Sequence, residues 1–259
     1  MMPASFAALE PQLLLWLVAM LRPGAAFFAA PLTGSPQVPM QLRLVISLAI
    51  GIPAVQLSGL HLPAEGLLSL PGLFLALGEI VIGLGMGFAV QLGFAAALVA
   101  GEAISNAMGI GFASMVNPMS GQSSSAIGHL LTLVATFLFL ASDGHLLFAR
   151  IVIESYAAFP PGGPVPLQLL GGLSNLGGLI FAAGLTIALP VTAALVLVQL
   201  IMGILGRSAP SLNLFSVGMP AAMVAGMILL AMTAPLMADA TLAAVNQGLA
   251  EAARIAHGG

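Results

Sequence analysis

Charge is what this sequence has least of. Charged residues make up 5% of its 259 residues, and every basic residue is an arginine, because lysine does not occur. A typical soluble domain carries about 25% charged residues, so the composition excludes an ordinary soluble globular protein. Intrinsic disorder is excluded as well, because it requires low hydrophobicity and 60% of this chain is apolar. The sequence predicts an integral membrane protein.

Cysteine and an excess of basic charge are also missing. Without cysteine the chain has no disulfide, no thiolate metal site and no cysteine nucleophile. The formal net charge of −3 excludes the basic surface that nucleic-acid binding needs. The sequence contains neither a His-Glu-x-x-His zinc motif nor a Gly-Lys-Ser phosphate loop. We therefore expect no cofactor, no metal and no nucleic-acid partner.

Long uncharged runs are abundant. A helix needs roughly 20 predominantly apolar residues to cross a bilayer, which predicts an all-α fold of about six hydrophobic helical segments, some broken or hairpin-like. We expect these segments near residues 12–31, 42–60, 68–90, 127–147, 178–205 and 212–236.

Two of the apolar runs are longer than one membrane crossing requires. Residues 67–100 and 167–206 would extend about 50 Å and about 60 Å as single helices, whereas the hydrocarbon core is about 30 Å thick. Either the runs contain breaks, for which Pro190 and the glycine pairs at 171–172 and 177–178 offer positions, or they extend beyond the bilayer while buried against protein.

The domain organisation follows from this pattern. Residues 1–236 form a multi-helix membrane domain that contains a central polar loop at 109–122. Residues 237–259 form an amphipathic tail, which we expect to dock on a partner or on the membrane surface. Its apolar residues recur every three or four positions: Leu242, Val245, Leu249, Ala252 and Ala256. The arginines divide three against two between the two sides of a six-span arrangement, which leaves the membrane orientation open.

A few acidic residues lie in or beside the apolar runs. An ionisable side chain in the membrane costs roughly 2.5–3.5 kcal/mol on insertion scales and usually faces a partner or a cavity. Glu79 lies deepest, and both a proton or ion pathway and pairing between helices remain open for it. Glu102, Asp143 and Glu154 border turns or span ends, which favours capping or pairing. Gly83 and Gly87, four residues apart, predict a close helix–helix contact.

The residue types of a hydrolytic triad are present around the central loop. Ser123–Ser125, His129, Asp143 and His145 supply serine, histidine and aspartate. A triad is recognised by geometry and not by residue type, so we assign no catalytic residue and expect no enzyme. An intramembrane hydrolase stays as a third alternative.

Methionines gather at the central loop, where Met108, Met115 and Met119 lie close together in sequence. Flexible thioethers adapt to changing surfaces and seal irregular gaps. A gating role and ordinary core filling are both open on this evidence.

The sequence around this loop resembles the central signature of the FliR family of flagellar export-gate proteins. The block Gly101–Pro118 reads GEAISNAMGIGFASMVNP. Three further blocks agree with the family in order and spacing, and they are Leu133–His145, Pro190–Gln199 and Gly203–Pro220. Virulence-associated type III secretion systems contain counterparts with the same fold, and the block Ala-Pro-Ser-Leu-Asn-Leu-Phe favours the flagellar branch.

The resemblance implies a subunit of the export gate in the bacterial inner membrane, within the flagellar basal body. Such a subunit forms a helical channel with FliP and FliQ, contacts FlhB, and passes unfolded flagellar proteins. The family's plug loop maps onto Gly109–Gln122, flanked by Met108. Phe112 and Met115 are then apolar closure residues, with Met119 beside them. The resemblance further assigns bending to Gly109, Gly111 and Gly121, and the loop's turn to Asn117 and Pro118. A proton- or ion-coupled small-solute transporter using Glu79 is the alternative function.

Overall fold

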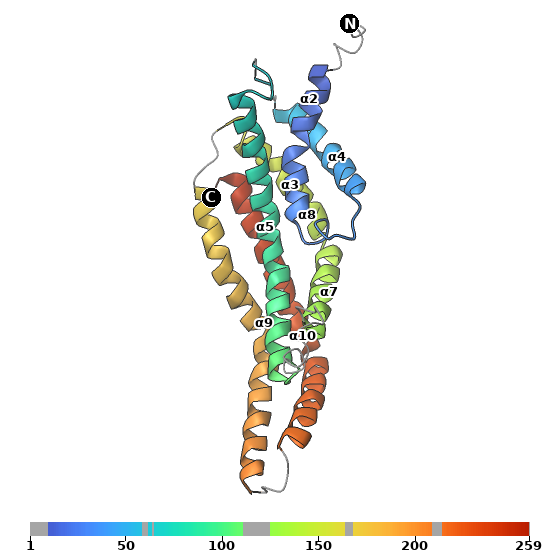
Figure 1. The fold of residues 1–259 in the computed structure, drawn as a ribbon, viewed down its shortest axis with the longest axis vertical. Helices are drawn as coiled ribbons and strands as arrows, with labels where there is room; N and C mark the ends of the chain where they lie inside the picture. Colours follow the sequence, from blue (N-terminus) through green and yellow to red (C-terminus); the bar gives the residue numbers. More distant parts are fainter. Residues whose placement is uncertain are drawn as a thin grey trace. The chain divides into compact units, whose positions relative to one another are not determined.

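The structure is a computed structural model that describes residues 10–58, 62–63, 65–110, 125–163, 168–208 and 214–258. Within these ranges it contains α-helices and no strand. In chain order (Figure 1) the helices are α2 (Glu10–Ala19), α3 (Leu21–Ala29), α4 (Met40–Ser58), α5 (Leu70–Ala107), α7 (Ala126–Ala141), α8 (Gly144–Ala158), α9 (Gln168–Ser208) and α10 (Leu214–His257). The predicted all-α membrane fold is confirmed.

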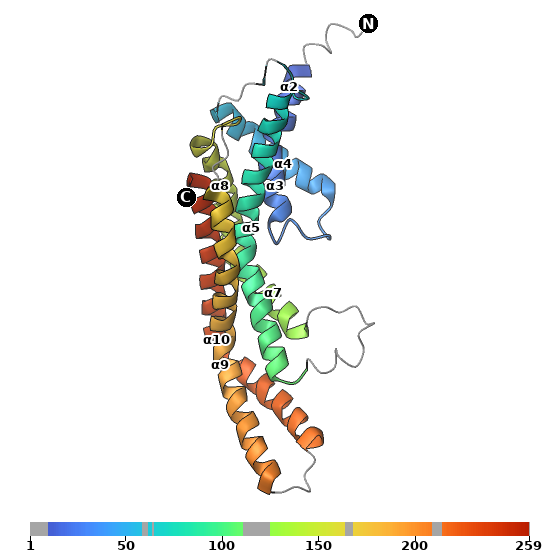
Figure 2. The same cartoon turned by 60° about the vertical axis from the view of Figure 1, so that its left-hand side comes forward.

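The chain divides into two compact units. Unit 1 consists of Met1–Gln91, Asp143–Leu176 and Gln247–Gly259, and unit 2 consists of Leu92–Ser142 and Gly177–Asn246. Within unit 2, the end of α9 and the start of α10 form a hairpin (Figures 1 and 2).

Local sequence signals explain where several helices begin. Ser69 precedes α5, and its hydroxyl accepts a hydrogen bond of 3.2 Å from the Gly72 N–H, while Pro71 in the first turn has no N–H to leave unpaired. Ser125 caps α7 in the same way, accepting from the Gly128 N–H at 3.0 Å. Asp143 separates α7 from α8 in the left-handed conformation, with φ of 55°.

The long apolar runs form continuous helices. α5, α9 and α10 contain 38, 41 and 44 residues, which corresponds to about 57, 62 and 66 Å. The alternative of breaks at Pro190 and at the glycine pairs is therefore wrong, since α9 runs through all of them.

About six hydrophobic helical segments were expected, and not all of the described helices have the length of a membrane span. In the described part of the chain four helices are long and apolar enough to cross a membrane, or five if the bent pair of α7 and α8 counts as one span. The apolar part of α4, Met40–Ala54, is a shorter helix. The four are Pro11–Ala29, Leu70–Ala107, Leu176–Ser208 and Gly218–His257.

Most of the segment expected to form an amphipathic tail is helical. Residues 237–257 are the continuation of α10, which ends at His257. Their apolar face is buried, since Leu249, Ala252 and Ala256 are at most 3% exposed. Gly248 lies against α5, because a Cβ atom there would be 2.9 Å from the Ala89 carbonyl oxygen. Beyond residue 246 this face packs on the chain's own unit 1.

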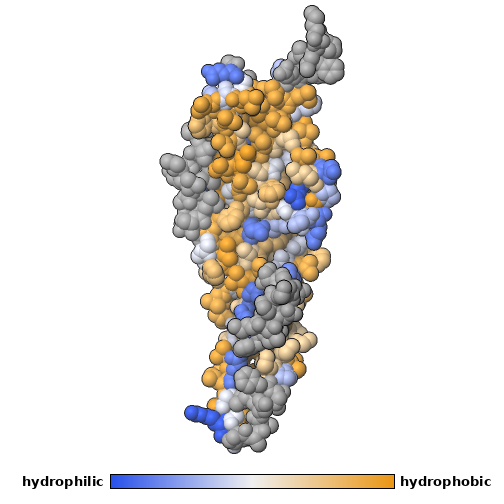
Figure 3. All heavy atoms as spheres, in the orientation of Figure 1, coloured by the Kyte–Doolittle hydropathy of each residue, from blue (hydrophilic) through white to orange (hydrophobic). Residues whose placement is uncertain are grey.

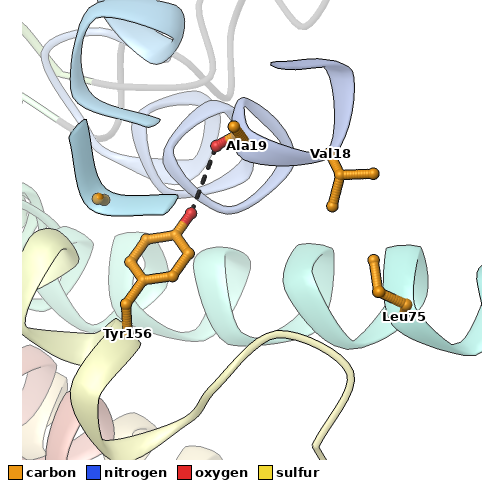
Figure 4. Close-up of a cluster of buried hydrophobic side chains, with 5 residues drawn as sticks. Val18, Ala19, Leu75 and Tyr156 are labelled. Atoms are coloured by element: carbon orange, nitrogen blue, oxygen red, sulfur yellow. Dashed lines mark hydrogen bonds between the residues drawn. The ribbon is translucent and has the colours of Figure 1, made fainter. Parts of the chain in front are cut away.

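The core of unit 1 joins α2, α4, α5 and α8. Val18, Ala19, Ala54, Leu75 and Tyr156 form one buried cluster (Figure 4). The Tyr156 hydroxyl donates to the Ala19 carbonyl oxygen at 3.3 Å, so the polar end of the ring is paired although it is buried.

Candidate functional site

A buried ion pair lies in unit 1, between α3 and α5. Arg22 is 0% exposed and Glu79 is 2% exposed. The Arg22 Nε donates to Glu79 Oε2 at 2.9 Å, and Nη2 donates to Oε1 at 2.7 Å. Two parallel hydrogen bonds of this kind are the strongest arrangement that arginine and a carboxylate form. The pair therefore holds the two helices in one register.

Groups from α8 and the residue that follows it complete the surroundings of the Arg22 guanidinium. Its Nη1 donates to the Ser155 Oγ at 3.0 Å, and its Nη2 donates to the Phe159 carbonyl oxygen at 2.8 Å. The Tyr156 ring centroid lies 4.0 Å from the guanidinium carbon, which adds a cation–π contact. One buried arginine thus links three helices.

Small residues allow the ion pair to form. A Cβ atom at Gly83, one turn after Glu79, would lie 2.3 Å from the Arg22 carbonyl oxygen. At Gly87 it would lie 2.2 Å from the Ala26 carbonyl oxygen. The close helix contact predicted from these two glycines is confirmed, with α3 as the partner of α5.

A second candidate lies in unit 2, where α5 ends and the central loop begins. The Gly109 N–H donates to the Asn106 carbonyl at 3.0 Å and the Ile110 N–H donates to the Ser105 carbonyl at 3.0 Å. With Gly109 at φ of 81°, this is a Schellman motif, which glycine forms most readily. The backbone geometry requires glycine at position 109.

A cavity of about 290 Å³ adjoins this helix end. We call it the methionine cradle, because Met108, Met202 and Met219 line it together with the Gln199 side chain. The Gln199 Nε2 donates to the Ala107 carbonyl oxygen at 2.7 Å, so α9 holds the last turn of α5.

Met108 is fixed from the α10 side. It is 2% exposed, and a Cβ atom at Gly226 would lie only 2.5 Å from its Cγ and 2.8 Å from its sulfur. The missing side chain at Gly226 therefore provides the space that Met108 occupies. The start of the predicted plug loop is anchored by α9 and α10 together.

Comparison with known proteins decides the family. Residues 13–248 match the family described as bacterial export proteins, family 1. This chain belongs to that family.

Flagellar relatives cover most of the chain. The flagellar biosynthetic protein FliR of Escherichia coli K12 is 34% identical over 222 residues, which are 85% of this chain and 84% of that protein. FliR of Caulobacter vibrioides is 30% identical over 217 residues, 82% of this chain and 85% of the relative. FliR of Bacillus subtilis is 28% identical over 221 residues, covering 83% and 84%. The FliR resemblance is confirmed, and the chain is a membrane-embedded component of the flagellar export apparatus.

Part of the site predicted from the FliR signature lies beyond what the structure describes. Met108 and Gly109 are described, as reported above. The remaining predicted loop residues lie outside the described ranges, namely Gly111, Phe112, Met115, Asn117, Pro118, Met119 and Gly121. Their closure and bending roles stay predictions.

Of the other acids expected to cap or pair in this FliR-family chain, Glu102 and Glu154 do so through their carboxylates. Glu102 is partly buried, and its Oε1 accepts from the Ser125 N–H at 2.6 Å, at the start of α7. Glu154 pairs with Arg150 at 2.7 Å on an exposed helix face. The carbonyl of Asp143 accepts from the first turn of α8. Capping and pairing thus account for the carboxylates of Glu102 and Glu154, whereas the Asp143 side chain makes no capping hydrogen bond.

The structure describes only part of the serine, histidine and aspartate set. Ser123 and Ser124 lie outside the described ranges, and the Ser125 hydroxyl is engaged as the cap of α7. Nor do the described residues bring three His, Cys, Asp or Glu side chains together as a metal site would need.

Sequence reasoning missed Arg22, Gln199 and Gly226. Arg22 interrupts an apolar run as Glu79 does, and this shared feature was the available signal for pairing them. Gln199 closes one of the blocks quoted for the resemblance, but no pattern marks its hydrogen bond. Gly226 stands among many glycines in apolar runs and carries no signal of its own.

Proposed function

We propose that this chain is a channel-forming subunit of the flagellar type III export gate in the bacterial inner membrane. It assembles with FliP and FliQ, contacts FlhB, and passes unfolded flagellar proteins. The observation that carries this proposal is the apolar surface of α9 and α10, which the chain itself leaves largely uncovered.

The apolar surface is extensive on both helices. In the most apolar stretch of α9 only 22% of residues are buried within the chain, and in that of α10 only 17% are. On α9, exposed apolar side chains run from Phe181 to Ile204, a distance of about 35 Å. Hydrophobic residues also cover much of the face shown in Figure 3. Exposed patches of this size mark membrane or protein contacts. In the proposed gate, neighbouring subunits and lipid together cover this surface.

The plug is the second part of the proposal. The loop Gly109–Gln122 starts at the methionine cradle, where Gln199 of α9 holds the Ala107 carbonyl and Gly226 of α10 lies against Met108. A firmly anchored start lets a short loop occupy one position across a channel, and apolar residues there exclude water and ions. Phe112 and Met115 form the seal, and Gly109 sets the direction in which the loop leaves α5.

Leakage of the assembled gate tests this proposal. The triple variant Phe112→Ser, Met115→Ser, Met119→Ser keeps the loop length but removes its apolar side chains. We expect a several-fold faster collapse of a proton gradient in inverted membrane vesicles that contain the complex with FliP and FliQ. The matched control is the triple variant Ser120→Ala, Ser123→Ala, Ser124→Ala, at the end of the loop and directly after it, which leaves the apolar side chains in place and should not change the leak.

Two results would contradict the proposal. If FliP and FliQ fail to co-purify with the unmodified chain, the channel assignment is wrong. If the complex forms normally and the triple serine variant leaks no faster than the alanine control, the loop is not a seal.

A further inference from the structure

A groove in unit 1 is left open by the chain. It lies between α3, α4 and α5 and has a volume of about 440 Å³, within the roughly 300–1,000 Å³ typical of small-molecule sites. Apolar side chains such as Leu21, Phe28 and Leu84 line it, and only Arg43 and Ser47 contribute polar side chains. The Ser47 hydroxyl already donates to the Arg43 carbonyl at 2.6 Å. The lining suits a hydrocarbon chain.

Arg43 brings an uncompensated positive charge to this groove. Its buried Nε donates to no acceptor, and no carboxylate pairs with it among the residues that the structure describes. Its Nη2 donates only to the Ser35 carbonyl, and its guanidinium carbon lies 5.7 Å from the Phe28 ring centroid. Arg22, by contrast, has a carboxylate partner. Arg43 therefore has capacity for an anion.

Arg43 lies near a helix end, beside the opening of the groove. It is in the first turn of α4, directly after the turns at residues 31–38, so it is close to a helix end. Leu44 of the groove wall, 41% exposed, and Phe28, 60% exposed, are open to the surroundings. A charge at a helix end beside an open apolar groove is the arrangement that anionic headgroups bind.

We propose that this groove binds an anionic phospholipid, with the phosphate paired to Arg43 and one acyl chain packed along α3, α4 and α5. The guanidinium fork matches phosphate oxygens in two parallel hydrogen bonds. The acyl chain covers the apolar side chains that the protein leaves open. The inference rests on the membrane location of the chain and does not depend on its role in a channel.

Lipid retention tests this assignment. The chain is captured through a tag from its native membranes together with the subunits that accompany it. The complex is then incubated with phosphatidylglycerol or phosphatidylcholine and examined by native mass spectrometry. We expect preferential retention of phosphatidylglycerol, and a fall of about fivefold in Arg43→Gln, the effect of one basic residue at an anionic surface.

Two further variants separate charge from shape. Arg207→Gln removes an equal charge from an exposed arginine outside the groove and leaves retention unchanged. Leu44→Trp keeps Arg43 but narrows the groove, and it lowers retention of both lipids.

Three outcomes would overturn the assignment. Equal retention of the two lipids by the unmodified complex excludes an anionic site. Unchanged phosphatidylglycerol in Arg43→Gln excludes Arg43 as its ligand. Loss of an accompanying subunit from Arg43→Gln, with lipid retention unaltered, assigns the groove to a protein carboxylate instead.

Discussion

At the scale of single residues, Arg22 and Glu79 leave solvent together and neutralise each other. Each ion alone would lose its hydration at a cost of several kcal/mol, and their attraction offsets this only when the geometry is good and further hydrogen bonds are made. Both conditions hold, because two bonds join the pair and Ser155 and Phe159 accept from the guanidinium. The carboxylate is thereby occupied, which removes the main support for Glu79 as a carrier of protons or ions.

The first prediction concerns this pair. Glu79→Gln leaves a buried arginine without its counter-ion and lowers the free energy of unfolding by about 3–5 kcal/mol. The double variant Arg22→Met, Glu79→Met removes both charges and recovers most of that loss. The midpoint temperature of thermal unfolding of the purified complex measures both effects.

The matched control is the exposed pair of Arg150 and Glu154, whose side chains are 74% and 40% exposed. Arg150→Gln changes stability by less than about 1 kcal/mol. If Glu79→Gln were equally mild, the buried pair would not hold unit 1 together. If the double variant is stable and assembled but export is blocked, the hypothesis of an ion pathway through Glu79 would be supported instead.

The burial of Glu79 could be predicted from the sequence, but the identity of its partner could not. Glu79 stands out because it lies deep in an apolar run, where an ionisable group must find a partner. Arg22 is 57 residues away, and only the contact between α3 and α5 brings it there. The periodicity of apolar residues within one segment does not indicate which distant segment packs against it.

At the scale of whole helices, the sequence showed where apolar segments lie but not how long each helix is. Pro190, Pro220 and Pro235 lie inside α9 and α10 without ending them. Proline is tolerated in membrane helices, because neighbouring helices and polar side chains satisfy the freed backbone groups. The apolar pattern of residues 237–259 was equally undecided, because a docked amphipathic tail and the buried end of a long helix have the same periodicity.

A second prediction belongs to the contact between α5 and α10. Gly226→Ala places a methyl group where it overlaps Met108, at 2.5 Å from Cγ. The Met108 side chain must then move, and overpacking of this kind costs about 1–3 kcal/mol. Thermal unfolding of the complex measures the loss. The second substitution Met108→Ala restores part of it by vacating the overlapped volume.

Gly203 in α9 provides the control for that substitution. A Cβ atom there meets nothing within 4 Å, so Gly203→Ala gains about 0.5–1 kcal/mol from helix propensity alone. Equal effects of the two alanine substitutions would mean that Gly226 does not position Met108.

At the scale of the whole molecule, low charge and exposed apolar surface have one explanation. The 5% of charged residues are mostly paired or placed at helix ends, so the lateral surfaces of the helices are left apolar. On α9 this surface runs from Phe181 to Ile204, about 35 Å, which is slightly more than the roughly 30 Å of the hydrocarbon core. Under the proposed function, neighbouring subunits cover this surface together with lipid.

Partner dependence gives the last prediction. Subunits that bind only the folded chain stabilise it by mass action, so the chain produced without FliP and FliQ should be degraded several-fold faster in a pulse–chase experiment than with them. Co-production of an unrelated membrane protein at the same level controls for load on the insertion machinery and should not extend the lifetime. A chain that is equally long-lived alone, and that takes up a small solute when reconstituted into liposomes, would instead be a transporter whose apolar helices need only lipid.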